Sequence, residues 1–152
     1  MRVLVTGATS YLGQHIVAQL AERGDIVTTF QRSSFDGPGI SIKGSINDSD
    51  AISKAMENQQ AVIHLAAKVA PLGSWKDFYS INVEGTRTLH AAAVTEGVSR
   101  FIYISTPSVA HSGSSISGGS AFPAMPDKVI GHYSKSKAVA ESWVLQQSNL
   151  HL

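Results

Sequence analysis

Short apolar runs alternate along the chain with longer segments in which apolar residues recur every three or four positions. The apolar runs predict strands at residues 2–6, 26–31, 40–43, 61–65 and 100–105. The periodic segments predict helices at residues 11–23, 48–57, 75–96 and 134–147. Strands that alternate with helices are typical of a doubly wound parallel sheet, covered by helices on both faces. We therefore predict an α/β fold with the strands in the order 3-2-1-4-5.

Several residues at the ends of these segments favour helix starts or stops. Gly24 follows the first predicted helix and Gly97 the third, and glycine is favoured just after a helix end. Either Asp48 or Ser49 can cap the second helix. Residues 112–127 are rich in Gly, Ser and Pro, so we predict a long mobile loop there.

The composition indicates one globular domain and excludes several kinds of partner. The chain has 152 residues, 43% of them hydrophobic, which is enough to bury one sizeable core. Its net charge is +1 and it has no block of Lys or Arg, so nucleic acid is not expected as a partner. With no cysteine and histidines that are far apart, neither a disulfide nor a metal site is predicted. No export signal and no long apolar stretch is seen, so we predict a cytoplasmic protein without membrane contact.

The segment TGATSYLG, residues 6–13, joins the first predicted strand to the first predicted helix. Such a loop collects free backbone N–H groups at the positive end of a helix dipole, which suits a pyrophosphate. Gly7 and Gly13 occupy the ends of a Gly-x-x-Gly-x-x-Gly frame, whereas Ser10 takes its middle position. An ordinary strand-to-helix turn is the alternative, but the place of the loop in a strand–helix–strand unit favours a dinucleotide site of Rossmann type. The predicted cofactor contacts of this loop are Gly7, Thr9, Ser10, Tyr11, Leu12 and Gly13.

Ser10 has two predicted roles in this loop. Serine is a favoured N-cap, and its hydroxyl can bond an exposed backbone N–H of the helix. The same hydroxyl could instead donate a hydrogen bond to the pyrophosphate.

The second predicted strand ends at Gln31, a position that faces the adenosine ribose in such folds. An acidic residue there would bind the ribose hydroxyls and repel a 2′-phosphate. Gln31 removes that repulsion, and Arg32, followed by Ser33, offers forked donors suited to a phosphate. This favours NADP(H) as the cofactor, with NAD(H) as the alternative. The structural alternative is that Arg32 is a solvated surface residue.

A second group of polar residues lies later in the chain. Tyr133 and Lys137 are four positions apart at the start of the last predicted helix, and therefore on one face. A lysine ammonium beside a phenol favours the phenolate, which suits proton exchange with a carbonyl or alcohol oxygen. Ser105 and Thr106 end the fifth predicted strand, at the carboxyl edge of the sheet. The glycine loop lies at the same edge, where open α/β sheets bind ligands.

Five segments together resemble the short-chain dehydrogenase/reductases, and specifically the extended branch with nucleotide-sugar epimerases, dehydratases and 3β-hydroxysteroid dehydrogenases. These segments are TGATSYLG at 6–13, AVIHLAA at 61–67, NVEGT at 82–86, RFIYIST at 100–106 and YSKSK at 133–137. They occur in the family's order and with its approximate spacing. The resemblance implies that Tyr133 is the general acid/base, and that Lys137 favours its phenolate and holds the nicotinamide ribose. It also implies that Thr106, rather than Ser105, places its hydroxyl beside the substrate oxygen.

The resemblance implies further cofactor contacts outside the glycine loop. The segment Leu65, Ala66 and Ala67 would line the nicotinamide half. Asn82 would lie near the nicotinamide; the alternative is a structural link between its helix and a neighbouring strand. The family often has an Asp after a Gly at the end of the third strand, where this chain has Ser45. Adenine recognition would then use backbone groups of Ser45 and Ile46.

The implied function is hydride transfer between NADP(H) and a small-molecule carbonyl or secondary alcohol. The implied substrates are like those of 3β-hydroxysteroid dehydrogenases or dihydroflavonol reductases. A nucleotide-sugar epimerase or dehydratase is one alternative, and a cofactor-binding regulatory module without catalysis is another. Extended members are much longer, so we expect residues 1–152 to be the N-terminal dinucleotide-binding domain of a longer enzyme. Residues 150–152 of this chain would begin a sixth strand. An uncovered edge of the sheet would favour homo-oligomers.

Overall fold

Five parallel strands form one sheet in the computed structural model, which describes residues 1–113 and 124–147. The strands are β1 (Arg2–Thr6), β2 (Ile26–Gln31), β3 (Ile40–Lys43), β4 (Ala61–His64) and β5 (Arg100–Tyr103). Their order is β3-β2-β1-β4-β5, and every neighbouring pair is parallel. The helices are α1 (Tyr11–Glu22), α2 (Ser49–Met56), α3 (Trp75–Tyr79), α4 (Gly85–Thr95) and α5 (His132–Leu145). The predicted α/β fold and strand order are confirmed.

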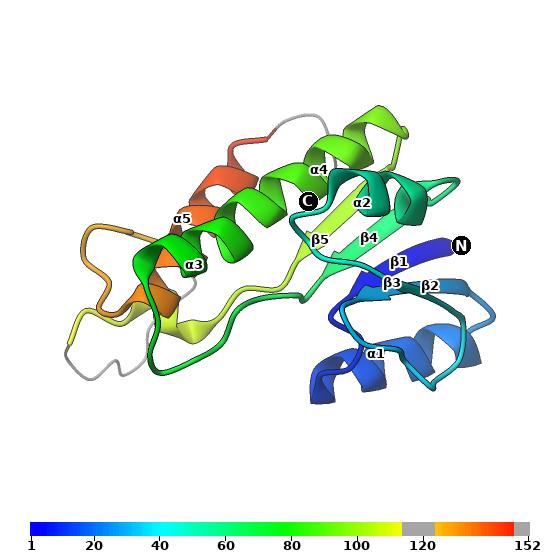
Figure 1. Cartoon of the computed structure of the whole chain (residues 1–152), viewed down its shortest axis with the longest axis horizontal. Coiled ribbons are helices and arrows are strands. Elements are labelled where there is room, and N and C mark those ends of the chain that lie inside the picture. The colour runs from blue at the N-terminus through cyan, green and yellow to red at the C-terminus, as the bar shows by residue number, and fades with distance from the viewer. Residues whose placement is uncertain (114–123, 148–152) are drawn as a thin grey trace.

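Helices cover both faces of the sheet (Figure 1). On one face lies α1, whose Val17 and Leu20 pack against Val3 and Val5 of β1. On the other face lie α2, α4 and α5, and Leu4 points into the core beneath them. Because successive side chains of a strand point to opposite faces, the apolar run of β1 fills both cores.

The fifth strand is shorter than the prediction, because its neighbour β4 ends first. The backbone N–H of Ile104 still donates to the carbonyl of His64 at 3.0 Å, and β4 ends at that residue. Ser105 and Thr106 therefore have no strand to pair with. The chain turns instead into the 3₁₀ helix η2 (Pro107–Ala110), which Thr106 caps. Both hydroxyl residues thus lie just beyond the carboxyl edge of the sheet.

The helix ends follow local chemistry. Asp48, not Ser49, caps α2: its carboxylate accepts hydrogen bonds from the backbone N–H groups two and three positions on, at 3.2 and 3.1 Å. Gly24 and Gly97 follow α1 and α4 with φ values of +85° and +68°, a conformation that favours glycine. Gly131, with φ +89°, is the N-cap of α5, which starts at His132, two residues before its predicted start.

The third predicted helix is continuous in the structure but not uniform. A π-helical segment, η1 (Ser80–Glu84), lies between α3 and α4 and carries the buried Asn82. Hydrophobic periodicity does not reveal such a widened turn. The predicted loop at 112–127 is described only at its two ends, and the predicted sixth strand at 150–152 lies outside the described residues. Among the residues that the structure describes, no helix is long and apolar enough to cross a membrane.

Candidate active site

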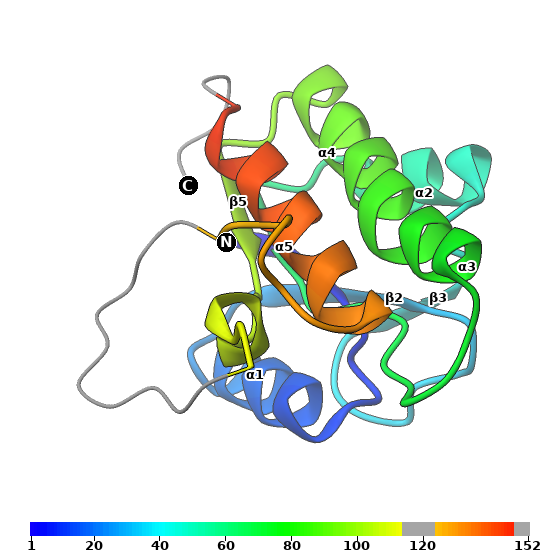
Figure 2. The same ribbon diagram turned by 90° about the vertical axis from the view of Figure 1, so that its left-hand side faces the viewer.

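The carboxyl ends of the strands face the viewer in Figure 2, and a cavity of about 590 Å³ lies at this edge. The glycine loop, the ends of β2 and β3 and the segment after β4 form its walls. Eleven of the predicted cofactor contacts line it: Gly7, Thr9, Ser10, Gln31, Arg32, Ser33, Ser45, Ile46, Leu65, Ala66 and Ala67. The other predicted site residues, which do not line it, are Tyr11, Leu12, Gly13, Asn82, Thr106, Tyr133 and Lys137.

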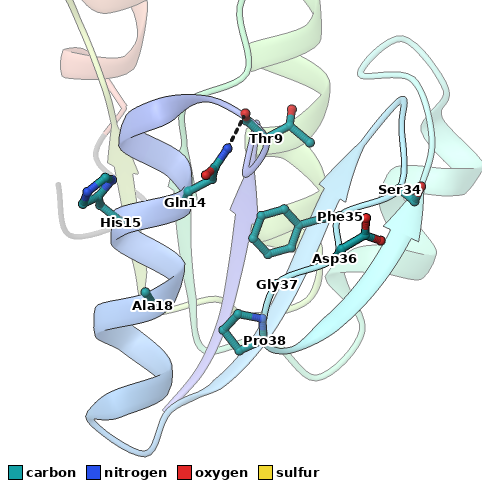
Figure 3. Close-up of a pocket in the computed structure, with 9 residues that line it drawn as sticks. All are labelled: Thr9, Gln14, His15, Ala18, Ser34, Phe35, Asp36, Gly37 and Pro38. Atoms are coloured by element: carbon teal, nitrogen blue, oxygen red, sulfur yellow. Dashed lines mark hydrogen bonds between the residues drawn. The ribbon is translucent and has the colours of Figure 1, made fainter.

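A second cavity, of about 580 Å³, lies between α1 and the segment after β2 (Figure 3). There the side-chain amide of Gln14 donates to the carbonyl of Thr9 at 3.1 Å, and Phe35 and Asp36 lie across from the helix. Thr9 is the one predicted cofactor contact in its lining, and the Asp36 carboxylate is unfavourable for a phosphate. The candidate site is therefore the first cavity.

The two glycines of the loop stand where a side chain would collide with backbone. Gly7 has a φ of +74°, and an added Cβ would lie 2.9 Å from the backbone nitrogen of Ala66. A Cβ on Gly13 would lie 2.4 Å from the carbonyl oxygen of Gly7. The hydroxyl of Ser10 accepts from the N–H of Gly13 at 3.1 Å and donates to the carbonyl of Gly7 at 2.9 Å. Ser10 thus caps α1, as one of its two predicted roles requires.

Gln31 is buried in the cavity wall at the end of β2. Its Nε2 donates to the hydroxyl oxygens of Thr29 and Ser41, each at 3.3 Å. Its Oε1 is buried and has no hydrogen-bond partner among the described residues. A buried acceptor without a partner is costly, so this oxygen suits a ligand that brings a hydroxyl donor. Arg32 and Ser33 lie exposed beside it.

Asn82 holds the cavity segment after β4 in place. Its side chain accepts from the backbone N–H of Lys68 at 2.6 Å and donates to the carbonyl of Lys68 at 3.1 Å. It also donates to the hydroxyl of Ser136 on α5, at 2.9 Å. The structural role of Asn82 is therefore present, although it links its helix to a loop and a helix rather than to a strand. Its contact with the cofactor stays a prediction.

Tyr133 and Lys137 lie one turn apart on α5, but the lysine is bound to the end of β5. Its Nζ donates to the carbonyl of Ile104 at 2.6 Å and lies 3.9 Å from the centre of the Tyr103 ring. Burial lowers the pKa of Lys137 to about 8, while the charge of Glu141 opposes that shift. In the part of the chain that the structure describes, no hydrogen bond joins Lys137 to Tyr133. The structure therefore ties this lysine to the end of β5.

The two hydroxyl residues after β5 have different partners. The Ser105 hydroxyl donates to the carboxylate of Glu141 on α5. The Thr106 hydroxyl is hydrogen-bonded to the Ser108 hydroxyl at 3.0 Å and accepts from the backbone N–H of Ser108 at 3.3 Å. Ser105 thus bonds an acidic group, whereas the Thr106 hydroxyl, among the residues that the structure describes, bonds only within its own turn. This difference favours Thr106 as the hydroxyl that a substrate oxygen could reach.

The sequence analysis missed two residues at this edge, Glu141 and Ser136. Glu141 lies four positions after Lys137, so helical spacing could have placed both on one face. Ser136 meets Asn82 across a separation of 54 residues, for which the sequence carries no local signal.

Comparison with known proteins identifies the family. The family model described as the NAD dependent epimerase/dehydratase family matches residues 3–151. The chain belongs to this family. It is 35% identical to a 2-alkyl-3-oxoalkanoate reductase of Stenotrophomonas maltophilia, covering 100% of this chain and 48% of that protein. It is 34% identical to a 3 beta-hydroxysteroid dehydrogenase/Delta 5→4-isomerase of Mycobacterium tuberculosis, covering 98% of this chain and 43% of that protein.

A solved structure has the same fold. It is a short-chain dehydrogenase/reductase superfamily protein from Agrobacterium tumefaciens with bound NAD, with a TM-score of 0.81 and 30% identity. The match covers 95% of this chain and 44% of that one. This member of the epimerase/dehydratase family spans about half the length of the curated relatives it matches. The resemblance to the extended short-chain branch is confirmed.

Proposed function

We propose that this chain is the dinucleotide-binding part of an enzyme that moves a hydride between NADP(H) and a carbonyl or secondary alcohol. The observation that carries the proposal is the convergence of the glycine-loop cavity and the Tyr133–Lys137 helix at one edge of the sheet. The Asn82 side chain joins the two, since it bonds both Lys68 in the cavity wall and Ser136 on the helix. When bound, the nicotinamide supplies or accepts the hydride.

The residues of the cavity fit a dinucleotide. Gly7 lets the loop pack closely against the backbone of Ala66, and this places the start of α1 at the cavity, where its free N–H groups would bind a pyrophosphate. The unpartnered Oε1 of Gln31 can accept a hydrogen bond from a ribose hydroxyl. A neutral amide at this position does not repel a 2′-phosphate, and the exposed Arg32 can bind one through its guanidinium.

Side chains on α5 and just beyond β5 would carry out the proton transfer. In a reduction, the Tyr133 hydroxyl would donate its proton to the oxygen that becomes the alcohol; in an oxidation, the phenolate would remove it. The Thr106 hydroxyl would donate a hydrogen bond to the same oxygen. Lys137 would hold the nicotinamide ribose, and Glu141 favours the charged form of this lysine.

The surroundings of Tyr133 favour an apolar substrate. Val69 and Leu72, in the segment after β4, are 70% and 84% exposed, and Ile130, just before α5, is 63% exposed. His132 hydrogen-bonds the carbonyl of Gly73 at 3.0 Å, which brings these two segments together beside Tyr133. Exposed apolar side chains at a ligand site suit a hydrocarbon body better than a charged nucleotide diphosphate. The names of the two curated relatives, an oxoalkanoate reductase and a hydroxysteroid dehydrogenase, point the same way.

The chemical part of the proposal is tested by Tyr133→Phe. Removing the hydroxyl should lower turnover of a hydrophobic ketone with NADPH by about 100- to 10,000-fold, because general acid catalysis is lost. The affinity for NADPH, measured by fluorescence titration, should change little. Turnover equal to that of the wild type would contradict the assignment of Tyr133. Hydride exchange without net oxidation of the cofactor would instead favour the epimerase or dehydratase alternative.

The cofactor preference is tested by Arg32→Ala. The wild type should bind NADPH more tightly than NADH, and the variant should lose about 10- to 100-fold of NADPH affinity while NADH affinity stays the same. The matched control is Arg100→Ala, at the exposed start of β5 on the opposite edge of the sheet. Equal affinities of the wild type for both cofactors would remove the NADP(H) preference and leave NAD(H).

A further inference from the structure

His64, the last residue of β4, is a polar ring in the middle of the core. It is fully buried, and its ring lies near the rings of Phe101 and Tyr103, with centroid distances of 6.1 and 5.8 Å. It does not line the cavity and is not among the residues proposed to contact cofactor or substrate. A buried imidazole is unfavourable unless both ring nitrogens are hydrogen-bonded, so its partners show what it does.

Both ring nitrogens of His64 are bonded, and the donors can be assigned. Nδ1 lies 2.7 Å from the hydroxyl of Thr6, and Nε2 lies 2.9 Å from the hydroxyl of Thr86. The Thr86 hydroxyl donates its single proton to the carbonyl of Asn82 at 2.8 Å, so it must accept from Nε2. The imidazole is then neutral, with its proton on Nε2, and Nδ1 accepts from Thr6. Burial, together with the charge of Lys137, lowers the pKa of His64 to about 3, in agreement with this neutral form.

The Nδ1 side of His64 leads to the cofactor cavity. The hydroxyl of Thr6 accepts a hydrogen bond from the backbone N–H of Ala66 at 3.1 Å. Ala66 lines the cavity, and its backbone is the surface against which Gly7 packs. A shift of Thr6 or Ala66 would therefore move the wall beside the glycine loop.

The Nε2 side of His64 leads to the helix that carries Tyr133. Through Thr86 it reaches the carbonyl of Asn82, in the π-helical segment. The side chain of Asn82 donates to the hydroxyl of Ser136, which in turn donates to the carbonyl of Tyr133 at 2.7 Å. The hydrogen bonds thus connect the cavity wall to the first turn of α5, passing at Asn82 from its backbone carbonyl to its side-chain amide.

We propose that His64 is a positioning residue, whose two hydrogen bonds set the cofactor cavity wall and the helix of Tyr133 relative to each other. The Nδ1 bond holds the cavity side, and the Nε2 bond holds the helix side. The proposal rests on the proposed function for the cofactor and for the role of Tyr133. The hydrogen-bond pattern itself does not depend on that function.

Two variants separate the two bonds. In His64→Asn the side-chain amide lies near the position of Nδ1, so the bond to Thr6 is kept and the bond to Thr86 is lost. In His64→Gln the amide nitrogen lies near the position of Nε2, so the bond to Thr86 is kept and the bond to Thr6 is lost. The readouts are NADPH affinity by fluorescence titration and hydrogen exchange at the start of α5, measured at the amide of Lys135, which donates to the carbonyl of Gly131 at 3.0 Å.

We expect opposite patterns from these variants. His64→Asn should keep NADPH affinity within about threefold and speed exchange at the start of α5 about tenfold, since one buried hydrogen bond is lost on that side. His64→Gln should weaken NADPH binding about tenfold and leave that exchange unchanged. Equal changes in both readouts for both variants would overturn the proposal, because a residue that only fills the core would not separate them.

Milder variants and the wild type keep the test decisive if the His64 variants do not fold. Thr86→Val should repeat the His64→Asn pattern. Thr88→Val is its control, because the half-buried Thr88 also bonds the carbonyl four residues earlier, but that bond is exposed to solvent. In the wild type, nitrogen NMR of His64 should show a protonated Nε2 and an unprotonated Nδ1 from about pH 5 to about pH 9. The opposite tautomer would overturn the proposal, whereas a wild type that binds neither NADPH nor NADH would contradict only the proposed function.

Discussion

The two sides of the candidate site are built by different kinds of contact. On the nucleotide side, residues 7–13, the hydroxyl of Ser10 bonds Gly7 and Gly13, each three positions away. On the tyrosine side, which comprises α5, η1 and residues 104–106, hydrogen bonds join residues that are far apart in the sequence. Lys137 bonds the carbonyl of Ile104 from 33 positions away, and Asn82 bonds Ser136 from 54. The bonds of Ser10 therefore form from local chain geometry, whereas these bonds of the tyrosine side form only when distant elements pack.

This difference predicts how each side responds to damage. The tyrosine-side bonds are buried or partly buried, so water replaces a lost partner less readily there. The hydroxyl of Ser10 is exposed, so water can replace the bonds that it makes. Substitutions on the tyrosine side should therefore lower the free energy of unfolding most. In the glycine loop, a side chain added in the crowded backbone should have a larger effect than the loss of the Ser10 hydroxyl.

The largest effect is expected from Asn82→Ala. This change leaves the backbone N–H and carbonyl of Lys68 and the Ser136 hydroxyl without their partner, so it should lower the free energy of unfolding by about 3 kcal/mol. Urea denaturation measures the change. Thr88→Ala, which removes a solvent-exposed hydrogen bond on the following helix, should cost less than about 1 kcal/mol. Equal stability of the two variants would contradict the idea that long-range bonds contribute more to stability than local ones.

An intermediate effect is expected from Gly13→Ala. The new Cβ would overlap the carbonyl oxygen of Gly7, so we expect a loss of about 2 kcal/mol in unfolding free energy and weaker NADPH binding. Gly24→Asn is the control, because among the described residues, the chain neighbours of Gly24 aside, no atom lies within 4 Å of a Cβ there, and asparagine tolerates its positive φ. It should cost less than about 1 kcal/mol. A fully stable Gly13→Ala would show that the loop can move aside.

The smallest effect is expected from Ser10. Ser10→Ala removes the cap of α1 and should lower the free energy of unfolding by about 1 kcal/mol, whereas Ser10→Gly should lower it by only a few tenths. Thermal denaturation of both variants measures this order. A loss in Ser10→Ala as large as that in Asn82→Ala would contradict the contrast between local and long-range bonds.

The parts of the site that depend only on residues close together in the sequence were predictable from the sequence. The glycine loop, the start of α1 and the one-turn spacing of Tyr133 and Lys137 follow from residues a few positions apart. The end of β5 was not predictable, because it depends on where β4 stops beside it. The π-helical segment was missed as well, since apolar side chains recur on one face whether or not one turn is wider.

The sequence by itself determined the parallel sheet, its strand order and the glycine loop, because hydrophobic periodicity, crossover handedness and the φ of glycine are local or general properties of a chain. Only the tertiary structure decided that Asn82 bonds Lys68 and Ser136, that Ser105 donates to Glu141, and that His64 links both sides of the site. These contacts depend on which groups face each other once the helices have packed on the sheet. Burial then makes each contact costly to lose, and that cost cannot be calculated before the neighbours are known.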